Sequence, residues 1–154
     1  MAIRVIEESG EVQAARTVDL AGPWRVRADP RNEGLERAWW RSTDWGGDAG
    51  TMQIPGAFQK ALGPDYHGVA WLARTVQLPA AWRGPGDNGQ RLRLRFESVA
   101  TDATVWVNAV EVGRHVGDFV PFQFDITDAA TGRADLTSSS VWTRCTRIAL
   151  PPAS

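Results

Sequence analysis

Residues 91–97 read R-L-R-L-R-F-E, and this alternation of charged and apolar side chains decides the fold class. Neighbouring side chains of a β-strand point to opposite faces, so Leu92, Leu94 and Phe96 would line a core while the arginines and Glu97 face water. The pattern predicts a strand of an antiparallel sheet with one buried and one solvated face.

Other short runs rich in β-branched and aromatic residues lie on both sides of this stretch, and glycine and proline separate them. These runs are residues 23–28, 68–78, 103–107, 110–113 and 119–126. The helical signal is thin, since only residues 34–40 could form one or two turns. At least six short strands without crossover helices imply antiparallel sheets packed face to face. We therefore expect an all-β fold, an antiparallel β-sandwich or jelly roll.

Three stretches depart from simple alternation. Asn108-Ala109 separates two runs in the manner of a hairpin turn, but alanine adopts positive φ poorly, which leaves open a turn of more than two residues. Pro121 lies inside the run 119–126 and predicts a sheet edge or a bulge there. Residues 141–150 could form a last strand with poor alternation, which would be either an edge strand or an end around which the fold is not built.

Length and composition limit the classes of function. A chain of 154 residues fits one domain, and its net charge of -1 gives no electrostatic signal for nucleic acid or a membrane surface. The single cysteine, Cys145, excludes an intrachain disulfide and provides no metal cluster. No apolar run approaches the roughly 20 residues of a membrane span, and residues 1–10 lack the apolar core of a secretion signal. We expect a cytoplasmic bacterial protein without a cofactor or metal.

Five segments, taken in order, resemble a known domain. They are L-A-G-P-W-R-V-R-A-D-P (20–30), M-Q-I-P-G-A-F (52–58), G-V-A-W-L-A-R-T-V-Q-L-P (68–79), R-L-R-L-R-F-E-S-V (91–99) and A-T-V-W-V-N-A-V-E-V-G-R-H-V-G-D-F-V-P-F-Q-F-D-I-T (103–127). Together they resemble the N-terminal sugar-binding domain of family 2 glycoside hydrolases, the β-galactosidase and β-glucuronidase group. The resemblance covers residues 18–128 and implies a jelly roll of the galactose-binding-domain-like type. Residues 129–154 are an atypical tail beside that pattern.

The resemblance implies no catalytic residue in this chain, because the two catalytic glutamates of the family lie on a barrel that follows the sugar-binding domain. The carboxylates present offer no replacement. Glu97 and Glu111 have the alternation of surface charges, and Asp125 has the position of a turn residue that closes a strand. His67 and His115 are isolated in the sequence, and no nucleophile, metal or phosphate-loop motif occurs.

Eight tryptophans are more than packing alone requires in a chain of this size. Trp24, Trp71 and Trp106 lie on predicted strands and are expected in the core. A sugar presents an apolar C–H face ringed by hydroxyl groups, so its binding site needs flat aromatic side chains and a few polar groups. The candidates for sugar binding are the loop residues Trp39, Trp40, Trp45, Tyr66 and His67.

The loop tryptophans admit three interpretations: a platform for a sugar, a cap over the sandwich, or a contact with a barrel. The function favoured is a non-catalytic carbohydrate-binding module for a galactoside or glucuronide. One alternative is a structural part of a glycoside hydrolase that buttresses a barrel and forms homo-oligomers when isolated. A second alternative is a hydrolase of unrecognised activity.

Overall fold

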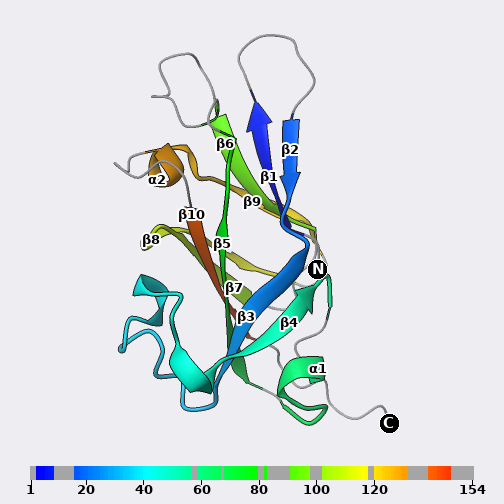
Figure 1. Cartoon of the computed structure of the whole chain (residues 1–154), viewed down its shortest axis with the longest axis vertical. Helices are drawn as coiled ribbons and strands as arrows, with labels where there is room; N and C mark the ends of the chain where they lie inside the picture. Colours follow the sequence, from blue (N-terminus) through cyan, green and yellow to red (C-terminus); the bar gives the residue numbers. More distant parts are fainter. Residues whose placement is uncertain are drawn as a thin grey trace.

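The computed structural model describes residues 3–8, 16–56, 59–66, 68–79, 82, 91–97, 102–117, 120–131 and 139–146. Within them two antiparallel sheets face each other (Figure 1). The smaller has the order β2 (Arg16–Asp19), β1 (Ile3–Glu8), β6 (Arg91–Phe96) and β9 (Phe122–Asp125). The larger has the order β4 (Gly50–Ile54), β3 (Gly22–Asp29), β5 (Val69–Val76), β10 (Ser139–Thr146), β7 (Asp102–Val107) and β8 (Val110–Val116). The expected all-β jelly-roll sandwich is confirmed.

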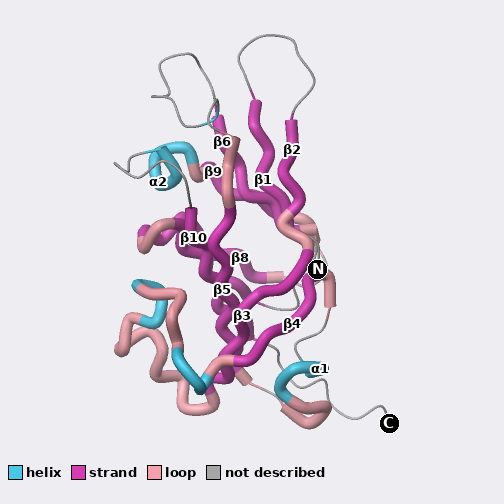
Figure 2. The backbone as a smooth tube through the Cα atoms, in the orientation of Figure 1, coloured by secondary structure: helices cyan, strands magenta, loops and turns pink. Residues whose placement is uncertain are grey.

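Helical structure is limited to short turns in the described part of the chain (Figure 2). The elements are the 3-10 turns η1 (Trp39–Arg41) and η2 (Gly46–Asp48) and the short helices α1 (Gln59–Leu62) and α2 (Thr127–Thr131). The turn expected within residues 34–40 is therefore present in part as η1. None of the described helices has the length and apolar character needed to cross a membrane.

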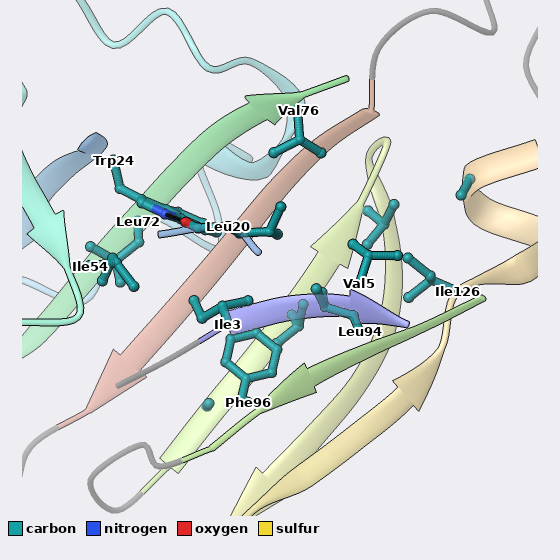
Figure 3. Close-up of a cluster of buried hydrophobic side chains, with 14 of the residues drawn as sticks. Ile3, Val5, Leu20, Trp24, Ile54, Leu72, Val76, Leu94, Phe96 and Ile126 are labelled. Atoms are coloured by element: carbon teal, nitrogen blue, oxygen red, sulfur yellow. Dashed lines mark hydrogen bonds between the residues drawn. The ribbon is translucent and has the colours of Figure 1, made fainter. Parts of the chain in front are cut away.

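The main core fills the layer between the two sheets. Leu92, Leu94 and Phe96 of β6 are fully buried there, as their alternation predicts. Figure 3 shows Ile3 of β1 and Leu72 of β5 in the same layer, so both sheets supply the core. Trp24 lies in this core too, and its indole N–H donates to the carbonyl oxygen of Leu20 at 2.8 Å.

The β7–β8 hairpin closes with a two-residue turn. Val107 pairs with Val110, and the intervening Asn108 and Ala109 have φ values of 51° and 64°. The possibility of a turn longer than two residues, left open by the sequence, is therefore wrong. A left-handed alanine costs about 1–2 kcal/mol, and the side-chain amide of Asn108 helps to offset this by donating to the carbonyl oxygen of Ala129 on α2 at 2.9 Å.

The last strand is not an edge strand, although an edge position was one of the alternatives considered from the sequence. β10 lies inside the larger sheet and pairs with β5 on one side and β7 on the other. Its alternation is poor because its inward positions carry Thr143 and Cys145, which are small and buried. β9, in contrast, begins just after Pro121 and is the outermost strand of the smaller sheet, so the edge predicted from that proline is confirmed.

Asp125 ends β9 as the expected turn residue. Its Oδ1 accepts hydrogen bonds from the backbone N–H of Thr127 at 2.9 Å and from the Thr127 hydroxyl at 2.6 Å. The same hydroxyl oxygen accepts from the backbone N–H of Leu92 at 2.9 Å. This small network ties the start of α2 to β6.

Candidate functional site: a tryptophan cap on the larger sheet

Strand β5 is buried on both faces of the larger sheet. Leu72 faces the main core, whereas Val69, Trp71 and Ala73 belong to a second apolar cluster together with Trp106 of β7. An apolar outer face has to be covered, because its exposure to water costs roughly 25 cal/mol per Å². The cover is the segment 30–49 between β3 and β4, which contributes Trp39, Trp40 and Trp45. We call these three residues, with Trp71 and Trp106 beneath them, the tryptophan cap.

The rings of the cap are stacked in order. Trp71 and Trp106 stack with centroids 5.1 Å apart and an interplanar angle of 22°. Trp40 then stacks on Trp106 at 6.2 Å with an angle of 5°, while Trp39 meets Trp71 edge to face at 5.9 Å. Both arrangements are favourable for aromatic pairs, at about 0.5–1.5 kcal/mol each beyond area burial. The cap is thus a packed aromatic layer on a rigid sheet.

A buried carboxylate holds the cap segment to the sheet. Asp29, at the end of β3, is 1% exposed. Its Oδ2 accepts from Trp71 Nε1 at 2.9 Å and from the backbone N–H of Gly34 at 2.9 Å, and its Oδ1 accepts from the backbone N–H of Glu33 at 2.8 Å. Three donors satisfy a charge that would be costly to bury alone.

Gly34 allows this close approach. A Cβ at this position would lie 2.5 Å from Trp71 Nε1 and 2.8 Å from Cε3 of Trp39. Trp45 is fixed in turn by its indole N–H, which donates to the carbonyl oxygen of Trp39 at 3.1 Å. Gly34, Trp39 and Trp45 are therefore buried against the sheet, although the sequence of the segment resembles a polar loop.

Tyr66 lies beside Asp29, the carboxylate that anchors the cap segment, and is not part of the stacked aromatic layer. Its hydroxyl donates to the carbonyl oxygen of Val69 at 2.5 Å and accepts from the backbone N–H of Asp29 at 3.2 Å. Partial burial raises the pKa of Tyr66, with a smaller opposing effect from the hydrogen bond of the Asp29 backbone. The residue remains a neutral phenol that braces the start of β5.

Two arginines lie over tryptophans of the cap in different ways. The Cζ of Arg27 is 3.6 Å from the ring centroid of Trp39, and its side chain, 18% exposed, also reaches Asp48 at 3.5 Å. The Cζ of Arg41 is 5.0 Å from the ring centroid of Trp40. Arg41 is exposed, and none of the described carboxylates forms an ion pair with it.

The sequence profile described as "Glycosyl hydrolases family 2, sugar binding domain" matches residues 49–142, from the start of β4 into β10. The chain belongs to this family. The match ends inside β10, so it reaches beyond residue 128, where the resemblance seen in the sequence ends.

Similar full-length proteins are β-glucuronidases. One of Paenibacillus borealis is 38% identical over 116 residues, which are 73% of this chain and 18% of that protein. The enzyme of Homo sapiens is 34% identical over 119 residues, 71% of this chain and 18% of that protein. The crystal structure of Ruminococcus gnavus β-glucuronidase has the same fold, with a TM-score of 0.70 at 24% identity over 93% of this chain and 22% of that one. The chain spans about a fifth of the length of these relatives.

The residues predicted to bind sugar differ in their burial and in their place in this sugar binding domain. Trp39 and Trp45 are each only 7% exposed, so their contacts fit the cap interpretation. Trp40 is only partly buried. Tyr66 lies near the Asp29 anchor, and His67 falls outside the described residues. A role of these residues in sugar binding stays a prediction.

The predicted core tryptophans of the sugar binding domain are all buried. Trp24 lies between the sheets, whereas Trp71 and Trp106 lie on the outer face under the cap. Sequence reasoning missed Asp29, Arg27 and Arg41. Alternation along P-W-R-V-R-A-D places Asp29 on the same face as Arg25 and Arg27, opposite Trp24 and Val26. The pattern therefore gave no signal that this acid would be buried beneath the cap.

Acid–base chemistry finds little support in the described part of the domain. Glu97 forms ion pairs with Arg4 at 2.6 Å and Arg95 at 2.9 Å. The hydrogen bond from Arg95, together with the charge of Arg4, lowers the pKa of Glu97, so this carboxyl is ionised at neutral pH. Burial raises the pKa of Cys145 to about 12, which disfavours its thiolate. Among the described residues no three His, Cys, Asp or Glu side chains gather as metal ligands.

Proposed function

We propose that this chain is a non-catalytic carbohydrate-binding domain whose ligand is a sugar of the glucuronide class. The observation that carries the proposal is the match of residues 49–142 to the sugar binding domain of family 2 glycosyl hydrolases. The choice of sugar class is supported by the β-glucuronidases among its relatives. The Ruminococcus gnavus enzyme has also been solved in complex with D-glucuronic acid. A galactoside is the alternative ligand.

Trp40 is the residue of the cap best placed to meet a sugar. Sugars stack their C–H faces on exposed indole surface, and a platform works best when its own position is already fixed. Trp40 is partly exposed and stacks on Trp106, whereas Trp39 and Trp45 are nearly inaccessible. The proposed contact is therefore a shallow one, for which millimolar affinity is expected.

The test is a titration of the isotope-labelled domain with glucuronides, galactosides and neutral sugars, followed by NMR. Saturable shifts that include the Trp40 indole N–H support the proposal, provided that Trp40→Ala removes them. Leu35→Ala is the matched control, because Leu35 is an apolar side chain of the same segment, 45% exposed. Absence of binding across the whole panel would contradict the proposal.

The burial of Trp39 and Trp45 favours a second candidate function. In that case the cap only completes the fold, and the domain serves as a structural part of a longer glycoside hydrolase that carries catalysis elsewhere. A domain that normally docks on other parts of a protein tends to self-associate when isolated. Sedimentation velocity between micromolar and millimolar concentration separates the two: a sugar-binding monomer supports the first function, and a homo-oligomer that binds no sugar supports the second.

A further inference from the structure

We propose that Trp40 and Arg41 together form a subsite that recognises the carboxylate of an acidic sugar. This inference rests on the proposed function and adds to it the residue that selects the charge of the ligand. It assigns the apolar face of the sugar to the Trp40 ring and the carboxylate to the Arg41 guanidinium.

Two arginine–tryptophan pairs of the cap differ in how far their cations are buried and in whether they have a carboxylate partner. In the pair Arg27–Trp39 the cation lies 3.6 Å from the ring centroid, is mostly buried and has Asp48 as a partner. In the pair Arg41–Trp40 the cation lies at 5.0 Å, is exposed and has no described carboxylate within ion-pair distance. The first pair is engaged in holding the fold. In the second, the guanidinium is exposed and lies over the Trp40 ring without a described carboxylate partner, so a sugar that stacks on this ring takes the place of the guanidinium and leaves it free to bind the carboxylate.

The geometry of Trp40 makes this donor fork useful. The ring is parallel to that of Trp106 within 5°, and Trp106 stacks in turn on Trp71, which is 0% exposed. The platform therefore rests on a rigid column that ends in the sheet. Arg41 belongs to η1 together with Trp40, so the cation is held close to the ring that would bind the sugar.

The chemistry of the pair favours an acid over its neutral counterpart. A guanidinium donates two parallel N–H bonds to a carboxylate, and such charge-assisted bonds are stronger than bonds between neutral groups. A neutral hexose would keep the stacking on Trp40 but lose this pair of bonds. Because the site is exposed, the preference is modest, about fivefold to tenfold, and weakens as salt increases.

The experiment compares D-glucuronic acid with D-glucose, which share the ring and its hydroxyl configuration and differ in the carboxylate. NMR titrations at low salt are run on the wild-type domain, on Arg41→Gln and on Trp40→Ala. Arg31→Gln is the matched control, because Arg31 is an exposed arginine of the same segment with no described ring beneath it. Near-UV circular dichroism of the tryptophans verifies that each variant keeps the cap.

The expected result is a fivefold to tenfold tighter binding of the acid by the wild type and by Arg31→Gln. Arg41→Gln should bind both sugars with the affinity that the wild type has for glucose, and Trp40→Ala should bind neither. Equal binding of acid and hexose by the wild type, or a preference that survives Arg41→Gln, overturns the subsite but leaves the carbohydrate-binding function intact. Failure of every sugar in the panel to bind overturns both.

Discussion

The indole N–H of Trp71 on β5 donates a 2.9 Å hydrogen bond to Oδ2 of Asp29 on β3, and both side chains are at most 1% exposed. This bond connects the two strands beneath the cap with the segment that covers them, because the same carboxylate binds the backbone of Gly34 and Glu33. One buried acid therefore ties the segment that carries Trp39, Trp40 and Trp45 to the sheet beneath it.

Replacing this acid should be among the most damaging single changes in the cap. Asp29→Ala leaves the indole N–H of Trp71 and two backbone N–H groups without their acceptor. We expect a loss of about 3 kcal/mol in the free energy of unfolding, measured by urea denaturation. Asp48→Ala is the control, since the Asp48 side chain is 79% exposed, and it should change stability by less than about 0.5 kcal/mol. A variant of Asp29 as stable as wild type would contradict the anchor role.

A second prediction concerns the contact at Gly34. In Gly34→Ala the new methyl group would meet Trp71 at 2.5 Å, so either the segment or the ring has to move. We expect a loss of about 1–3 kcal/mol and weaker near-UV circular dichroism from the stacked indoles. Gly47→Ala, in the same segment, has no atom within 4 Å of the added carbon and should leave both signals unchanged. The idea fails if the two variants behave alike.

A third prediction contrasts two buried threonines. The Thr143 hydroxyl on β10 is buried without a hydrogen-bond partner in the described structure, whereas the Thr127 hydroxyl bonds both Asp125 and the backbone of Leu92. Thr143→Val should therefore stabilise the domain by about 1 kcal/mol, and Thr127→Val should destabilise it by about the same amount or more. Chemical denaturation of both variants tests the opposite signs. Destabilisation by both would show that Thr143 has a polar role.

A fourth prediction concerns acid stability. Partial burial alone would raise the pKa of Asp125, but hydrogen bonds from Thr127 and the charges of Arg91 and Arg93 lower it overall. A carboxyl with a depressed folded pKa contributes stability above its unfolded pKa, and this contribution is lost as the pH falls through the folded value. At pH values below about 4, the melting temperature of the wild type should thus decrease as the pH is lowered. The decrease should be less steep in Asp125→Asn.

The control for the acid experiment is Asp128→Asn, which removes an exposed carboxylate on the neighbouring helix α2. It should retain the wild-type slope of melting temperature against pH. If Asp125→Asn also retains the wild-type slope, the network around Thr127 does not contribute to acid sensitivity.

The elements that could be predicted from sequence are those whose pattern is set locally. The alternation of residues 91–97 was sufficient for β6, and Pro121 was sufficient for the edge at β9. The run V-A-W-L-A in β5 carries no alternation, and such a run is typical of a strand covered on both faces. The covering segment could not be found in this way, because W-W-R-S-T-D-W-G-G-D has neither strand nor helix periodicity.

The position of β10 could not be predicted from its local sequence either. Its place depends on partners far away in sequence, β5 and β7, and not on its own composition. Its outward-facing Arg144 is tolerated because its Nη2 donates to Oδ1 of Asn32, in the cap segment, at 2.6 Å. Ala109 adopts a positive φ of 64°, which alanine disfavours, because the hairpin register leaves room for a turn of two residues only.

The insertion of β10 between β5 and β7 has a consequence for synthesis of the chain on the ribosome. Until residues 139–146 emerge, the larger sheet can exist only as two separate pieces, β4-β3-β5 and β7-β8, each with an unpaired inner edge. Free edges of this kind invite pairing with other nascent chains. Pairing of this kind is therefore most favourable in the interval between translation of β8 and translation of β10.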